Sequence, residues 1–240
     1  MKKIAVISHS GGLDSTTLLA YKLDQGYHVL PINVNYGQRN VVEMVCQKNI
    51  IDYYKKKYPN QLQDTTVIDL SSTFKSFEEK VEDFRNNGFN NKNLEELNFY
   101  FPNRNMLFFA LAGVFGEVYA LAEDLERVEL CLGIHKHTTY KEYWDIKPEF
   151  ANAMKIVFGL NDAITVEVDA PFVDFTKEKI IETTKNLNVP YKLTWTCYEP
   201  QEKEQNLFVP CNKCDACIER QEFAVNTIPD INEYFVEIHN

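Results

Sequence analysis

The feature that most constrains the fold is a short apolar run, Ile4–Ser8, which leads directly into a loop with paired glycines, Ser10–Ser15. The run shows no polar alternation, which is typical of a strand buried on both faces of a parallel sheet. Apolar residues then recur at helical spacing over Thr16–Leu23, in a helix that we expect to begin at Ser15, and Val29–Val34 is typical of a second buried strand. This order of strand, glycine turn, helix and strand predicts a βαβ unit with a right-handed crossover.

The same alternation continues along the chain. We expect further helices over Val41–Tyr58, Met106–Leu125 and Thr176–Leu187, and further strands over Thr66–Leu70, Val128–Gly133 and Thr165–Val168. Repeated strand-then-helix order predicts an α/β fold with a doubly wound parallel sheet. Met106–Leu125 has apolar residues on most faces, which predicts a buried helix. The charged segment Ser76–Phe101 has weak periodicity and is expected to be a surface excursion.

The balance of charge limits the partners of the chain. Its 240 residues include 25 basic and 35 acidic side chains, a formal net charge of -10. Proteins that bind nucleic acid usually have the opposite balance or a basic stripe, so no direct nucleic-acid partner is expected. The N-terminal residues lack the pattern of a signal peptide, and acidic residues interrupt the closest candidate for a membrane span, Met106–Leu125. We therefore expect a cytoplasmic protein that does not bind a membrane.

The loop Ser10–Ser15, with the sequence SGGLDS, has the features of a nucleotide-binding site. Its position between strand and helix directs backbone N–H groups and the positive end of the helix dipole toward one point, where a polyphosphate binds. Ser10, Ser15 and Thr16 can add hydroxyl donors, and Asp14 can hold the Mg²⁺ that accompanies the phosphates. A glycine turn that only joins strand to helix is the alternative.

Four of the six cysteines, Cys197, Cys211, Cys214 and Cys217, lie close together in the sequence. Four thiolates at short spacing suit a tetrahedral Zn²⁺ that leaves no open position for a substrate, so the metal is expected to be structural. On spacing alone, an iron–sulfur cluster or a reactive Cys-x-x-Cys pair remains open.

The two motifs, with the residues between them, resemble the QueC family of 7-cyano-7-deazaguanine synthases, which are N-type ATP pyrophosphatases. The segments that carry the resemblance are collinear: Ser10–Thr17, Tyr36–Arg39, Pro102–Asn105, Tyr143–Phe150, Ala170–Phe172, Thr176–Ile181, Thr194–Tyr198 and Cys211–Arg220. The resemblance implies an adenine nucleotide alpha hydrolase-like domain over residues 1–193, with a zinc-binding region over 194–240 packed on it.

The resemblance also implies an activity, that of an ATP-dependent carbon–nitrogen ligase. Such an enzyme adenylates the carboxylate of 7-carboxy-7-deazaguanine, splitting ATP to AMP and pyrophosphate, and uses ammonia to reach the nitrile through the amide. ATP, Mg²⁺ and Zn²⁺ are the implied cofactors, the deazaguanine and ammonia are the substrates, and a homodimer is the expected assembly.

The resemblance assigns roles to individual residues. ATP is expected at Ser10, Gly11, Gly12, Leu13, Asp14, Ser15, Thr16 and Thr17, and catalysis at Asp14, Ser15 and Lys177. The substrate is expected at Arg104, Asn105, Asp145, Lys147 and Glu149. Lys147 departs from the family, which usually has an arginine there, and a lysine offers a point charge in place of a planar fork.

Two alternatives to the nitrile synthase stay open, the first of which is compatible with this departure. One is a divergent enzyme that transfers the activated deazaguanine carboxylate to another amine, such as one on a partner protein in antiviral defence. The other is a non-catalytic nucleotide-binding sensor. We favour the nitrile synthase because the motifs outside Tyr143–Phe150 are preserved.

Overall fold

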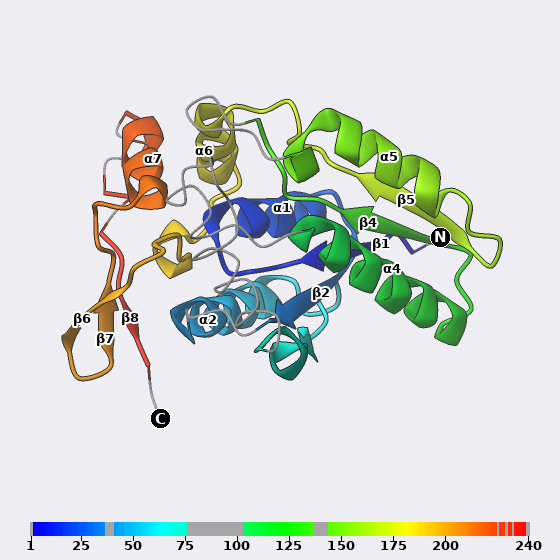
Figure 1. Cartoon of the computed structure of the whole chain (residues 1–240), viewed down its shortest axis with the longest axis horizontal. Helices are drawn as coiled ribbons and strands as arrows, with labels where there is room; N and C mark the ends of the chain where they lie inside the picture. Colours follow the sequence, from blue (N-terminus) through cyan, green and yellow to red (C-terminus); the bar gives the residue numbers. More distant parts are fainter. Residues whose placement is uncertain are drawn as a thin grey trace, which may run out of the picture.

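The computed structural model describes residues 2–36, 41–75, 103–136, 144–224, 226–228, 230–231 and 233–238. Five parallel strands form its main sheet, in the order β3-β2-β1-β4-β5 (Figure 1). They are β1 (Ile4–Ser8), β2 (His28–Asn35), β3 (Thr66–Asp69), β4 (Arg127–Cys131) and β5 (Thr165–Asp169). The strand order reverses between β1 and β4, so the predicted doubly wound sheet is confirmed.

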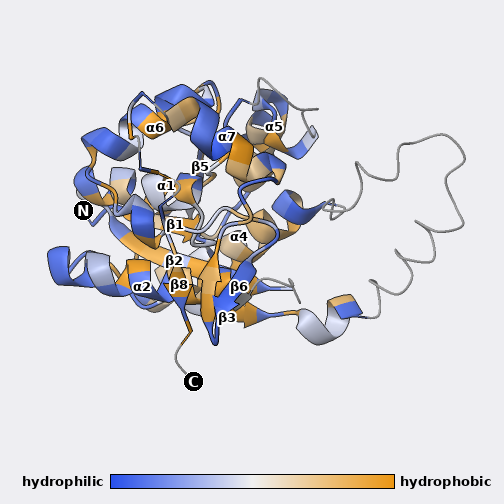
Figure 2. Ribbon diagram, turned by 90° about the vertical axis from the view of Figure 1, so that its left-hand side faces the viewer, coloured by the Kyte–Doolittle hydropathy of each residue, from blue (hydrophilic) through white to orange (hydrophobic). Residues whose placement is uncertain are grey.

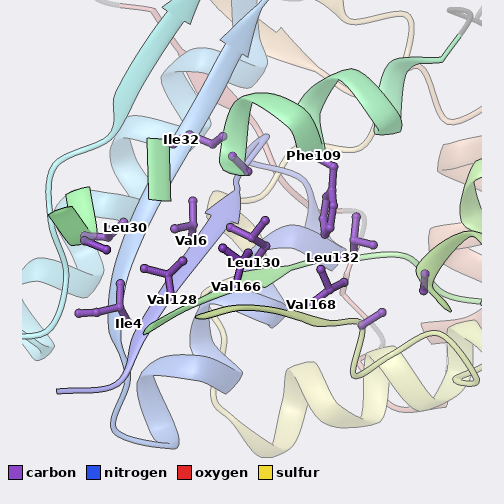
Figure 3. Packing of buried hydrophobic residues seen from close by; sticks show 14 of the residues in the cluster. Ile4, Val6, Leu30, Ile32, Phe109, Val128, Leu130, Leu132, Val166 and Val168 are labelled. Carbon is purple, nitrogen blue, oxygen red and sulfur yellow. The ribbon is translucent and has the colours of Figure 1, made fainter. Parts of the chain in front are cut away.

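Helices cover both faces of this sheet. α1 (Leu13–Asp24), α2 (Val41–Lys57) and α6 (Lys177–Asn186) pack on one face, and α4 (Arg104–Ala122) and α5 (Pro148–Phe158) pack on the other. In β1, Ile4 and Val6 belong to the core on the α4 side, and Ala5 and Ile7 belong to the core on the α1 side. Figure 3 shows Val6 and Phe109 in the first of these cores. Because both faces are covered, β1 has no polar alternation.

Local signals set the helix ends. Gly12 is the N-cap of α1, which begins at Leu13, two residues before the predicted start. Thr176 caps α6 as predicted, by accepting a hydrogen bond from the backbone N–H of Lys179 at 3.5 Å. Sequence analysis does not predict α5, although Pro148 occupies its favoured first position. The predicted excursion Ser76–Phe101 lies outside the described residues.

The prediction that the long apolar helix is buried is only half right. α4 buries Phe109, Ala112 and Ala120 against the sheet, but Val114 and Val118 are 64% and 61% exposed. The sheet covers one side of a helix that is apolar all round, so the other side faces outward. Within the described residues, α4 is the one helix that is long and apolar enough to cross a membrane. Its packing on β1 and β4 is that of a core helix.

The C-terminal residues build a separate small sheet. β6 (Gln201–Glu204), β7 (Leu207–Val209) and β8 (Val236–Glu237) are antiparallel, and α7 (Asp215–Ala224) lies beside them (Figure 1). These elements follow the short 3-10 helix η3 (Tyr191–Leu193), which ends at the predicted boundary. The backbone N–H of Trp195 donates to the carbonyl oxygen of Gly11 at 3.0 Å, so the region packs directly on the loop after β1. The division at residue 193 remains a prediction.

Candidate active site and metal centre

The loop after β1 requires glycine at its centre. Gly11 has a φ of +85°, and a Cβ atom there would lie 2.8 Å from the carbonyl oxygen of Glu43 and 2.9 Å from the backbone nitrogen of Gln47. The next residue, Gly12, caps α1 without a side chain. The first N–H groups of α1 are therefore left for an anion, at the switch point of the sheet where ligands bind in such folds.

The hydroxyl groups of this loop fall into two sets. Ser10 and Ser15 lie on the exposed side of the loop. Their hydroxyl oxygen atoms are 3.1 Å apart, and the backbone N–H of Gly12 donates to the hydroxyl of Ser10 at 3.2 Å. Thr16 and Thr17 are fully buried. Thr16 donates to the carbonyl oxygen of Gly12 at 2.7 Å, and Thr17 donates to that of Leu13 at 2.8 Å. These two threonines and the buried Leu13 support the loop from behind.

Four ionisable side chains from separate elements meet beside the loop. Lys177, at the start of α6, donates to both carboxylate oxygens of Asp14, at 2.8 and 2.9 Å. His135, which follows β4, has its Nε2 atom 3.5 Å from Asp14 Oδ2. Glu219 of α7 lies 3.9 Å from Lys177 Nζ. We call these four residues the Asp14 cluster.

The Asp14 cluster keeps its central carboxylate ionised. Burial alone would raise the pKa of Asp14, but the charge of Lys177 and the contact with His135 outweigh it and hold the pKa well below its usual range. Burial raises the pKa of Glu219, with Lys177 opposing this shift. An anionic Asp14 beside uncapped helix N–H groups is the combination that a magnesium–phosphate ligand needs.

Sequence analysis did not identify His135 or Glu219. His135 follows β4, the strand next to β1, and residues at the carboxyl ends of these two strands meet at the switch point. Glu219 is two residues after Cys217 in a segment that was assigned only to the metal. The position of His135 follows from the order of the strands in the sheet. The position of Glu219 depends on how α7 packs.

The predicted substrate residues lie at the start of α4 and α5. Asn105 donates from its backbone to Asp145 Oδ2 at 3.4 Å and from its side chain to the Asp145 carbonyl oxygen at 3.1 Å. Asp145 is buried, Lys147 is the half-buried N-cap of α5, and Glu149 is exposed in its first turn. In the described part of the chain, no hydrogen bond or ion pair links Lys147 or Glu149 to the Asp14 cluster.

Tyr198 is influenced by charges from both the start of α4 and the Asp14 cluster. Burial raises the pKa of Tyr198 to about 12, and the charges of Arg104, Glu219 and Asp14 also act on this pKa. Arg104, at the start of α4, is therefore close enough to Tyr198 for its charge to act on the same side chain as the charges of the Asp14 cluster. Almost half of the Tyr198 side chain, 49%, is exposed.

The four clustered cysteines have the geometry of a tetrahedral metal site. Their sulfur atoms all lie within 4.8 Å of one another, and those of Cys211 and Cys217 are 4.0 Å apart. A tetrahedron with metal–sulfur bonds of about 2.3 Å separates its sulfurs by about 3.8 Å. The backbone N–H groups of Glu199 and Cys211 donate to the sulfur of Cys197 at 3.3 and 3.2 Å, which favours its thiolate form.

A fully buried arginine holds this region together. Arg220 donates to the carbonyl oxygen of Ile231 at 3.2 Å, to the hydroxyl of Thr196 at 2.7 Å and to the carbonyl oxygen of Tyr191 at 2.8 Å. Its guanidinium also lies 4.1 Å from the ring centroid of Tyr234. Because Arg220 follows Glu219 in α7, these bonds fix the position from which Glu219 reaches the Asp14 cluster.

Comparison with known proteins gives one consistent family. The family described as "Queuosine biosynthesis protein QueC" matches residues 4–227. A 7-cyano-7-deazaguanine synthase of Picrophilus torridus is 34% identical over 220 residues, which cover 90% of this chain and 84% of that protein. One of Caldicellulosiruptor saccharolyticus is 35% identical over 238 residues, with 98% and 96% covered. The structure of NMN synthetase from Francisella tularensis, at 14% identity, covers 79% of this chain and 63% of its own with a TM-score of 0.43, too low to inform the site.

Proposed function

This chain belongs to the QueC family, and we propose that it is an ATP-dependent ligase that makes 7-cyano-7-deazaguanine, as the names of its relatives indicate. The substrates are 7-carboxy-7-deazaguanine, ATP and ammonia. The observation that carries the proposal is the Asp14 cluster beside the uncapped N-terminus of α1, at the switch point of the sheet. That arrangement suits transfer of an adenylyl group.

The first step activates the carboxylate. A substrate carboxylate oxygen attacks the α-phosphorus of ATP, the bond from that phosphorus to the bridging oxygen breaks, and pyrophosphate leaves. The N–H groups at the start of α1 and the hydroxyls of Ser10 and Ser15 bind the leaving phosphates. Lys177 shifts from Asp14 to the phosphate, where its charge offsets the negative charge that develops in the transition state.

The next steps introduce nitrogen. Ammonia attacks the carbonyl carbon of the acyl adenylate, the carbon–oxygen bond to AMP breaks, and the nitrogen loses a proton to give the amide. A second ATP activates the amide oxygen in the same way. The C–O bond to AMP then breaks, two protons leave the nitrogen and the nitrile forms. The protein contributes mainly by holding the reacting groups in place and excluding water.

Two metals complete the proposal. Mg²⁺, held by Asp14 together with the phosphates, would supply positive charge to the leaving pyrophosphate. Zn²⁺, held by Cys197, Cys211, Cys214 and Cys217, would be structural, because four thiolates leave no open position. Zinc is preferred to a four-iron cluster because the cluster places each cysteine on a different iron atom and would spread the sulfurs more widely than the structure does.

The charges of the substrate residues indicate which part of the substrate each of them would bind. We propose that Arg104 and Lys147 bind the substrate carboxylate, and that Glu149 accepts hydrogen bonds from the N–H groups of the guanine-like edge. Asp145 already accepts hydrogen bonds from Asn105, so this pair would hold the start of α4 against the turn before α5. We also propose that the protein is a homodimer, as expected from the family resemblance. No observation favours a different acceptor amine or a non-catalytic sensor.

One assay tests the proposed function. The purified protein is incubated with 7-carboxy-7-deazaguanine, ammonium and magnesium–ATP, and the products and the protein are weighed by mass spectrometry. Free 7-cyano-7-deazaguanine, AMP and pyrophosphate are the expected products. Adenylate without nitrile, or deazaguanine mass on another molecule, would reject the nitrile synthase and support an enzyme that transfers the activated carboxylate to another amine. If the protein does not turn over ATP, the non-catalytic nucleotide-binding sensor is the remaining function.

A further inference from the structure

A buried histidine lies directly behind the nucleotide loop. His9 comes between β1 and Ser10, and its side chain is fully buried. Its Nε2 atom lies 3.1 Å from the hydroxyl oxygen of Thr16, in the first turn of α1. β1 itself is hydrophobic (Figure 2), and an apolar side chain would fill the next buried position without the cost of burying a polar ring. Packing alone therefore does not account for a histidine here.

The hydroxyl of Thr16 determines which ring nitrogen of His9 carries the proton. Thr16 donates its only hydroxyl proton to the carbonyl oxygen of Gly12 at 2.7 Å, so it accepts a hydrogen bond from His9 Nε2. The other ring nitrogen, Nδ1, is buried and has no hydrogen-bond partner among the described residues. Burial lowers the pKa of His9 to about 3, which keeps the ring neutral. His9 is therefore a single, fixed donor to Thr16.

This donor acts on a peptide group of the loop through Thr16. The carbonyl oxygen of Gly12 accepts from the hydroxyl of Thr16 at 2.7 Å, from its backbone N–H at 3.1 Å and from the hydroxyl of Ser15 at 3.2 Å. That carbonyl shares a rigid peptide plane with the N–H of Leu13, so fixing the direction of one fixes the other. The N–H of Leu13 is the first of the uncapped N–H groups of α1. Thr16, held by His9, therefore keeps this N–H directed toward the phosphates.

The carbonyl group of His9 is fixed as well. Asn33 of β2 donates from its side chain to this oxygen at 3.1 Å, and Gln47 of α2 donates to it at 2.9 Å. Both side chains are buried. The same peptide plane carries the N–H of Ser10, which donates to the hydroxyl of Ser15 at 3.3 Å. β2 and α2 therefore orient the peptide group at the start of the loop.

We propose that His9 is a positioning residue for the ATP site, which acts through Thr16 and is itself held by Asn33 and Gln47. This inference rests on the proposed function only in that the loop binds the phosphates of ATP. N–H groups that already point toward the anion bind it without being reordered, and donors fixed in advance stabilise charge better than mobile ones. In the described part of the chain, no hydrogen bond joins His9, Asn33 or Gln47 to the substrate residues of α4 and α5. Loss of His9 therefore affects ATP and spares the deazaguanine.

Calorimetric titration with magnesium–ATP, without deazaguanine or ammonia, tests the proposal. His9→Leu removes the donor and should weaken ATP binding about five- to tenfold, the loss expected for one oriented hydrogen bond. His9→Gln should restore most of the affinity, because the glutamine amide N–H can reach the position of the imidazole Nε2. His28→Leu is the matched control. His28 is also buried and hydrogen-bonded, to Asn60 and Gln63, but it lies at the opposite end of the parallel sheet, so this variant should keep the native ATP affinity.

A double-variant cycle shows whether His9 acts through Thr16. Thr16→Val removes the hydroxyl that accepts the hydrogen bond, so adding His9→Leu should weaken ATP binding no further. Steady-state kinetics of His9→Leu should show a higher KM for ATP and an unchanged KM for 7-carboxy-7-deazaguanine. Circular dichroism checks the fold. If His9→Leu does not fold, Gln47→Leu replaces it, because that variant frees the His9 carbonyl and should weaken ATP binding in the same direction.

The outcomes separate this proposal from the proposed function. Native ATP affinity in folded His9→Leu, or equal losses in His9→Leu and His28→Leu, overturns the positioning role. A double variant whose loss is the product of the two single losses also overturns it, because His9 would then act independently of Thr16. A protein that shows the expected differences in ATP binding but makes no nitrile would retain the positioning role and reject the nitrile synthase.

Discussion

Lys177 Nζ lies 2.8 Å from Asp14 Oδ1 and 2.9 Å from Asp14 Oδ2, although 163 positions separate the two residues in the chain. The lysine is only 3% exposed, and the carboxylate neutralises its charge in the absence of other ligands. Both groups suit the same nucleotide, the lysine as a partner for phosphate and the aspartate as a partner for Mg²⁺. Binding of magnesium–ATP would then exchange one ion pair for two new contacts without leaving a buried charge unpaired.

Asp14→Ala is expected to abolish pyrophosphate release while the protein stays folded. The carboxylate organises the magnesium and the phosphates, and removal of one such electrostatic contact lowers kcat by about 100-fold or more. A coupled pyrophosphate assay measures the loss, and circular dichroism checks the fold. Retained turnover in the variant would reject the assignment of the site.

The stability contribution of Asp14 should depend on pH in one direction. Its pKa is lower in the folded protein than in the unfolded chain, so the contribution is present above the unfolded value of about 3.9 and is lost as pH falls toward the folded value. Urea unfolding of the native protein and Asp14→Asn at pH 7, 5 and 3.5 measures the difference. The difference should not fall between pH 7 and 5, where an imidazolium at His135 can only add to it, and it should be smaller at pH 3.5 than at pH 5; a fall between pH 7 and 5 contradicts the ion pair.

One Zn²⁺ ion per chain is expected in the folded protein. Cys211→Ser should lose the metal and lower the free energy of unfolding by several kcal/mol, since binding to such sites supplies roughly 10 kcal/mol of folding free energy. Elemental analysis counts the metal. Cys46→Ser is the control, because Cys46 is buried beside this region but is not in the sulfur cluster, and it should keep one zinc. Iron in place of zinc, or folded protein without metal, would refute the assignment.

Gly11→Ala should weaken ATP binding beyond its effect on stability. A non-glycine residue at positive φ costs about 1–2 kcal/mol, and here the added Cβ would also meet the backbone of α2 at 2.8 Å and displace the loop. Gly26→Ala is a matched control, with a φ of +79° and no atom within 4 Å of the added Cβ. Calorimetric titration should show weaker binding only for Gly11→Ala. Equal ATP affinity in the two variants would show that the loop does not contact the nucleotide.

Lys147→Arg should keep or improve the kcat/KM for 7-carboxy-7-deazaguanine. If Lys147 binds the substrate carboxylate, arginine can make the same contact with two parallel hydrogen bonds. Lys155→Arg, on the same helix but outside the substrate residues, should change nothing. A large loss for Lys147→Arg would mean that the segment around Lys147 has adapted to another acceptor.

The local part of the fold could be predicted from the sequence. β1, the glycine loop and α1 follow one another within the first 24 residues, and their pattern depends on burial and backbone freedom that neighbouring residues reveal. The sequence also predicts the cysteine set for the same reason, since Cys211, Cys214 and Cys217 follow one another at intervals of three positions, just before and within α7. The structure gathers all four sulfur atoms as the spacing indicated.

Tertiary structure alone decided which distant groups join these local motifs. His135 and Glu219 reach the Asp14 cluster because β4 lies next to β1 and because α7 is fixed by Arg220, and no short-range pattern encodes either fact. The same reason explains the error over α4. The apolar residues on all sides of α4 indicate that its surface avoids water. The sequence pattern does not show what covers each side of the helix. The packing of the chain determines that the sheet covers one side and leaves the other exposed.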